Sequence, residues 1–266
     1  MRGIIEHVRA IARRYSELNG RVSAAAITLY GLFALFALCV LAVAIVGILA
    51  TGNDDVAADI VSWLGLHGDA AKTVIDAVNT AQHSAKVASI VGIIGLVWVG
   101  SSFAVSVASA YDVAWGVPSR VTRARVVGLG WLAGSGVLLA IGSFVTAGFA
   151  ALPALAAPLV LAGSLSVNTA LWLWTSWILP NRPRPPWRSL LPGSITGAIG
   201  LEVLKVAGAF VVPRLVEKSS ALYGTIGVVF ALIAWLWVLG RLVVLVTIIE
   251  TLDRSRLEPD DLPIVI

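Results

Sequence analysis

Six long apolar stretches alternate with shorter polar segments along the 266 residues of the chain. They cover residues 22–50, 87–111, 126–151, 155–179, 190–212 and 221–249. Each is long enough for a helix that crosses a hydrocarbon core of about 30 Å, which needs roughly 20 residues. The first stretch exceeds the apolar core of a cleavable signal peptide, so we interpret it as a retained helix. The pattern predicts an all-α fold, a polytopic membrane bundle of six transmembrane helices.

Two segments outside these stretches show the spacing of amphipathic helices. In residues 1–21 the apolar positions recur every three or four residues and the opposite side is basic. This is typical of an interfacial helix on anionic lipid, although a helix packed against the end of the bundle explains the stripe equally. Residues 51–86 contain two further patterns, around Trp63 and Ile75. We therefore predict a short helical loop there, a transmembrane domain over 22–252 and a tail over 253–266.

The composition agrees with a membrane domain and no separate soluble domain. Apolar residues make up 58% of the chain and charged residues 13%, against about 45–50% and 25% in soluble domains. The mean hydropathy is +0.92. Cys39 is the single cysteine, so an intramolecular disulfide is excluded.

Basic residues gather on one side of the predicted spans. The side with both termini carries thirteen of them: Arg2, Arg9, Arg13, Arg14, Arg21, Arg120, Arg123, Arg125, Arg182, Arg184, Arg188, Arg254 and Arg256. The other side carries four: Lys72, Lys86, Arg214 and Lys218. Because Lys and Arg are enriched in cytoplasmic loops, we predict that both termini are cytoplasmic and that the 51–86 loop is external.

Three charged residues lie inside the last two apolar stretches. Glu202 and Lys205 are three residues apart and share a helix face. At 1.5 Å per residue, Glu202 lies about 18 Å from the cytoplasmic side and Arg241 about 12 Å. If the two helices pack together, the charges lie within about one helical turn of depth.

Such a cluster has two interpretations. Ionisable groups at membrane depth are costly and commonly mark functional sites, and one acid with two bases leaves a positive charge that suits a lipid phosphate or carboxylate. Alternatively, Glu202, Lys205 and Arg241 form a buried network that only fixes the register of the helices. On the first interpretation these three residues bind substrate.

The loop after the fourth stretch is rigid and basic. Prolines restrict its backbone, Trp187 suits the membrane interface, and its arginines suit lipid phosphates. We predict headgroup contacts by Arg182, Arg184, Trp187 and Arg188. We predict no nucleic-acid partner, because topology alone explains the arginines.

Two GxxxG pairs, Gly193/Gly197 and Gly130/Gly134, permit close approach of helices. The approach is either within the bundle or between two copies of the chain, which would form a homo-oligomer. The three histidines show no paired ligand spacing, and one cysteine builds no zinc site. No P-loop and no nucleophile elbow occurs. We therefore predict no metal, no cofactor and no enzymatic activity.

The chain resembles the YihY/virulence factor BrkB family. The resemblance is carried by Pro180-Asn181-Arg182, Pro186-Trp187-Arg188, Leu191-Pro192-Gly193, Glu202-x-x-Lys205, Leu222-Tyr223-Gly224-Thr225-Ile226-Gly227 and Trp235-Leu236-Trp237, with Thr28-Leu29-Tyr30 upstream. Three positions depart from it: Ala37 replaces a usual proline, Arg241 a small or apolar residue, and only Glu250 remains of the closing Gly-Ala-Glu-Leu-Asn.

The resemblance implies a six-span protein of the bacterial inner membrane. Transport of envelope lipids has been suggested for the family, and some members carry an older ribonuclease label. Phosphodiester hydrolysis needs a metal cluster or an acid/base pair within reach of RNA, which this sequence does not offer. The predicted function is to move or bind an anionic lipid or other amphiphile for envelope biogenesis. The alternative is an envelope scaffold that transports nothing and binds partners.

Overall fold

The computed structural model describes residues 2–50, 72, 75–76, 80, 87, 89–150, 156–182, 185–223 and 225–257. Regular structure in these ranges is entirely helical. The elements are α1 (Arg2–Glu17), α2 (Gly20–Ala50), the π-helical turn η1 (Leu96–Gly100), α5 (Ser101–Ala114), α6 (Val121–Ala150), α7 (Ala156–Ile178), α8 (Trp187–Tyr223) and α9 (Thr225–Leu257). The predicted all-α fold is confirmed.

Five helices are long and apolar enough to cross a membrane: Gly20–Ile48, Ser89–Ala114, Val121–Val145, Trp187–Val211 and Val229–Leu252. They coincide with five of the six predicted stretches. α7 occupies the position of the fourth stretch and has 23 residues, but it is not among these five helices. The sixth span is therefore not confirmed.

The chain divides into two compact units. The first comprises Met1–Leu32 and Ser101–Ile266, and the second Phe33–Gly100. In the second unit, a Cβ placed on Gly92 would lie 3.1 Å from the backbone of Leu41, so two helical segments approach closely there. Most of the predicted external loop, 51–86, lies outside the described residues, as do residues 258–266 of the predicted tail.

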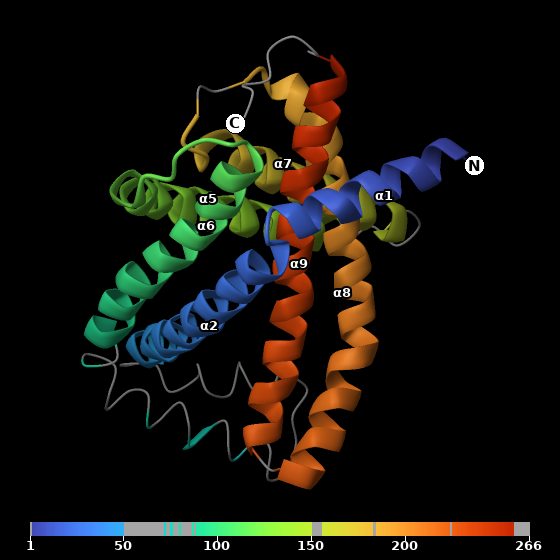
Figure 1. Ribbon diagram of the computed structural model, residues 1–266. Helices are drawn as coiled ribbons and strands as arrows, with labels where there is room; N and C mark the ends of the chain where they lie inside the picture. The colour runs from blue at the N-terminus through green and yellow to red at the C-terminus, as the bar shows by residue number, and fades with distance from the viewer. Residues whose placement is uncertain are drawn as a thin grey trace. The chain divides into compact units, whose positions relative to one another are not determined.

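In the first unit, α8 and α9 run side by side (Figure 1), and α7 packs on α8. Glycines on α8 receive large side chains of its neighbours. A Cβ at Gly200 would lie 2.6 Å from Leu242, and one at Gly208 would lie 2.6 Å from Trp235. Such small residues let helix backbones approach in a membrane, where dispersion contacts replace the hydrophobic effect as the source of stability.

The α1 helix is present and packs on α9, which it crosses in Figure 1. Ile11, Tyr15 and Leu18 contact the buried core of the first unit. Asn19 separates α1 from α2 with a φ of 51°, a left-handed conformation that asparagine tolerates better than most residues. The amphipathic, interfacial role of this helix stays a prediction.

Two connecting segments of the first unit are tied together. α5 ends in a Schellman motif, in which Gly116 has a φ of 64° and Val117 N donates to Asp112 O at 2.9 Å. The Asp112 carboxylate accepts from Asn181 N at 2.7 Å. The Asn181 side chain in turn donates to Pro118 O at 2.7 Å. The α5–α6 and α7–α8 connections therefore lie against each other.

Candidate functional site

Glu202 is the centre of a polar cluster between α7 and α8. Its Oε1 accepts from Ser164 Oγ at 2.5 Å, from Lys205 Nζ at 3.0 Å, and from the side-chain amide of Asn168. Lys205 Nζ also donates to Ser164 Oγ at 3.0 Å. The predicted Glu202–Lys205 pair is therefore formed, and two residues of α7 that sequence analysis did not single out complete it.

Burial divides this cluster into an inner and an outer part. Asn168 is 3% exposed, whereas the side chain of Glu202 is 16% exposed and that of Lys205 48%. An ammonium group has three N–H donors, and two of those on Lys205 are used by Glu202 and Ser164. The third has no acceptor among the described residues, so the outer part of the cluster offers a donor with positive charge.

Arg241 does not join this cluster. Its guanidinium lies over the ring of Trp237, 3.5 Å from the ring centroid. Among the described residues, the ion-pair partner of Glu202 is Lys205 and not Arg241. Consecutive residues of a helix turn by about 100°. Arg241 is therefore displaced by about 100° from Leu242 and about 180° from Glu250, two α9 residues that pack on α8. The expected pairing of Glu202 with Arg241 is not formed.

The residues expected to contact headgroups have separate environments. The Arg182 guanidinium stacks on Trp115 at 3.6 Å from the ring centroid and donates to Ser176 O at 3.3 Å. The Arg188 guanidinium lies 5.5 Å from the ring centroid of Trp187. Trp187 and Arg188 are both exposed at the start of α8, whereas Arg184 lies outside the described residues.

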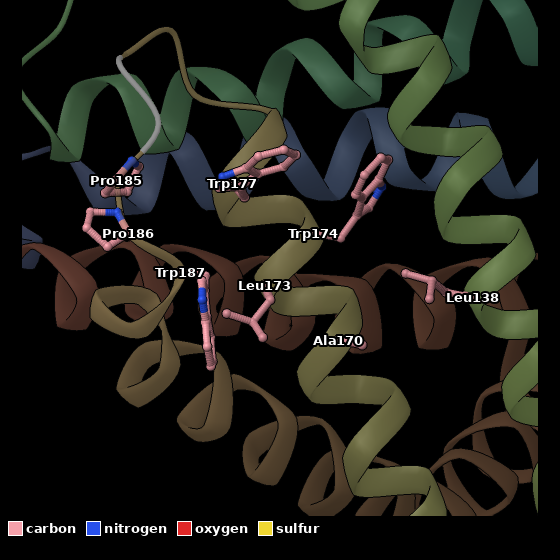
Figure 2. A pocket seen from close by; sticks show the side chains of 8 residues that line it. All are labelled: Leu138, Ala170, Leu173, Trp174, Trp177, Pro185, Pro186 and Trp187. Atoms are coloured by element: carbon pink, nitrogen blue, oxygen red, sulfur yellow. The ribbon is translucent and has the colours of Figure 1, made fainter.

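An apolar groove of about 570 Å³ adjoins Trp187. Figure 2 shows Trp174 and Trp177 from α7, Pro185 and Pro186 from the connecting segment, and Trp187 at the start of α8. Leu138 of α6, with Ala170 and Leu173 of α7, completes the lining. The groove has the shape and polarity to hold a hydrocarbon chain or a ring, and none of the described residues that line it is charged.

A second polar cluster is fully buried in the first unit, where α5, α7 and α9 each contribute one residue. Glu250 Oε1 accepts from Ser176 Oγ at 2.6 Å, and Ser176 Oγ is 3.0 Å from the hydroxyl of Tyr111. All three residues are at most 1% exposed. Glu250 directly follows the last predicted apolar stretch, which ends at residue 249. An acid flanked by Ile249 and Thr251 was the signal that could have identified it.

The four glycines of the two GxxxG pairs have different surroundings. A Cβ on Gly193 would overlap the Glu250 side chain, and one on Gly197 would lie 2.7 Å from Trp172. Gly134 faces Trp174 at 2.6 Å, whereas Gly130 has open space around it. Three of the four glycines therefore serve contacts inside the chain. An oligomer through either pair stays a prediction.

The sequence profile of the family "Virulence factor BrkB" matches residues 11–259. The chain belongs to the BrkB family. One of two curated relatives is named as a protein of the inner membrane. The first is the inner membrane protein YhjD of Escherichia coli K12, 35% identical over 82 residues, which are 31% of this chain and 23% of that protein. The chain thus matches about a quarter of the length of YhjD.

The second relative is an uncharacterized protein of Dickeya dadantii strain 3937. It is 25% identical over 265 residues, which cover 90% of this chain and 80% of the relative. No solved structure matches the chain. As a BrkB family member with five candidate spans, the chain is a multi-pass membrane protein, consistent with the inner membrane.

Proposed function

We propose that this BrkB protein binds an anionic lipid or other anionic amphiphile in the inner membrane. It moves or holds that molecule for envelope biogenesis and catalyses no reaction. The Lys205 ammonium carries the proposal, because Glu202 and Ser164 hold it in place while one N–H remains available outside. A phosphate or carboxylate oxygen is the acceptor that an ammonium prefers.

Three further features support an amphiphile as the ligand. The Arg188 and Trp187 pair lies at the start of α8, a combination that suits the headgroup region. The groove beside it is lined by tryptophan, proline and aliphatic side chains, and these suit an acyl chain. Arg241 contributes a second positive charge within a candidate span, and its Nε has no hydrogen-bond acceptor in the described part of the chain.

Lys205→Gln should abolish or strongly reduce the movement of anionic lipid while leaving the protein folded. A hydrogen bond to a charged group contributes about 1.5–3 kcal/mol, so the rate should fall about tenfold or more. Purified protein would be reconstituted into vesicles that contain labelled phosphatidylglycerol or, in parallel, labelled phosphatidylcholine. The exposure of the label to a membrane-impermeant quencher gives the rate, and native mass spectrometry gives lipid binding.

Lys205→Arg is the matched control, because it keeps the positive charge and should keep most of the movement. If wild type and Lys205→Gln move anionic lipid at the same rate, the proposed site at Lys205 is contradicted. Binding without movement, lost in Lys205→Gln, would leave a lipid-holding protein. If wild type neither binds nor moves anionic lipid, the scaffold alternative gains, and loss of function should then concentrate in the 51–86 segment.

We further propose that both termini are cytoplasmic. The contact between the connections at Asp112 and Asn181 supports this, because two basic connections that touch lie on one side of the membrane. Reporter fusions at residues 120 and 185 should give cytoplasmic signals and a fusion near residue 70 an external one. An external signal at either basic connection would contradict the topology.

A further inference from the structure

Among the residues whose side chains the structure describes, Glu250 has no ion-pair partner, although it lies inside a candidate membrane span. It is 1% exposed, and a Cβ at Gly193 would overlap its Cγ, so the side chain is enclosed between α7, α8 and α9. Oε1 accepts from Ser176, whereas Oε2 has no hydrogen-bond partner among the described residues. The ion pairs that join described residues do not include Glu250.

Among the described side chains, few ionisable groups surround Glu250. α5 contributes Tyr111, and the segment after α7 contributes Arg182, whose charge acts on both Glu250 and Tyr111. The guanidinium of Arg182 stacks on Trp115 instead of pairing with the acid. Asp112 and Arg123 bind backbone groups of 179–181. α8 presents Gly193, and α1 packs Tyr15 against the core.

An ionised Glu250 would leave a buried anionic oxygen without a donor, which is among the most costly arrangements in a protein interior. Binding a proton at Oε2 removes the charge and keeps the bond from Ser176 to Oε1. We propose that Glu250 is a proton-binding site of the membrane domain, in which the hydrogen bonds run from Tyr111 through Ser176 to Oε1 and the bound proton lies on Oε2.

This site goes beyond lipid binding, because it links a proton to the packing of helices. Gly193 leaves no space between α8 and the Glu250 side chain. Release of the proton would create a charge that needs a new donor, and Arg182 is the nearby group that can supply one by leaving Trp115. Proton release therefore requires a rearrangement of the α7–α8 connection or of the α8–α9 contact.

Infrared spectroscopy of the reconstituted protein at neutral pH tests the site without any measurement of lipid transport. Exposed carboxyls ionise at roughly pH 4, so a carboxylic-acid C=O band at neutral pH must come from a protected acid. We expect the band in wild type, its complete loss in Glu250→Gln, and its retention in Glu202→Gln and Asp112→Asn. Glutamine matches the protonated acid in shape and still accepts from Ser176.

Wild type without the band overturns the proposal, and so does a band that survives Glu250→Gln. If Glu250→Gln does not fold, Ser176→Ala decides. Removal of the donor to Oε1 should shift the C=O band, and an unshifted band would assign the proton to another acid.

Discussion

Gly193→Leu should prevent α8 and α9 from packing. The leucine side chain would occupy the volume that Glu250 fills, and the helix backbones cannot separate there without breaking the Gly200 and Gly208 contacts. Overpacking of a well-packed core costs about 1–3 kcal/mol and occasionally more. The enclosed Glu250 side chain cannot move aside to make room for the leucine. We expect a loss of about 3 kcal/mol or more, visible as a lower thermal midpoint in detergent or as aggregated protein.

Gly130→Leu is the matched control for this prediction. Gly130 also belongs to a GxxxG pair, but it is exposed on α6 and a Cβ there meets nothing within 4 Å. The Gly130→Leu protein should lose no more than about 0.5 kcal/mol of stability. A gain in stability also agrees with the prediction, since glycine costs a helix interior about 1 kcal/mol. Equal damage from the two substitutions would mean that α8 and α9 do not meet at Gly193.

The helices were predictable because the solvent of a membrane protein imposes a simple rule. A segment that crosses hydrocarbon needs a run of apolar residues about 20 long, so six apolar stretches could be placed from the sequence, and five of them coincide with candidate spans. The same rule placed a stretch at α7, which is not among the five candidate spans, and there Asn168, Thr175 and Ser176 bond to partners on neighbouring helices. A polar side chain that is satisfied by a neighbouring helix lowers hydropathy without marking the end of a helix.

The charged cluster was only partly predictable. Glu202 and Lys205 meet because their spacing along one helix is local information. The pairing with Arg241 was inferred from depth, but two residues of packed helices touch only if they also share the contact face. Those faces are set by the glycines of α8 and the side chains they receive. Ser164 and Asn168, four residues apart on one face of α7, were the available signal for the true partners.

A pair of double-mutant cycles measures which of the two bases belongs to Glu202. Glu202→Gln should destabilise the protein by roughly 2 kcal/mol, because hydrogen bonds to a charged acceptor contribute about 1.5–3 kcal/mol and Asn168 and Ser164 keep only a neutral one. The same substitution should cost much less in a Lys205→Met background. The coupling energy of that cycle should lie between about 0.5 and 3 kcal/mol, as for residues in contact.

The second cycle pairs Glu202→Gln with Arg241→Gln. Arg241 stacks on Trp237 on another face of α9, so the two substitutions should add within about 0.5 kcal/mol. Steric trapping in lipid micelles gives the unfolding free energy of each variant. A coupling to Arg241 as large as that to Lys205 would show that α8 and α9 pack with a different rotation from the one described. Without coupling to Lys205, the ion pair would contribute nothing to stability, and the ammonium would not be held in place for an anionic ligand.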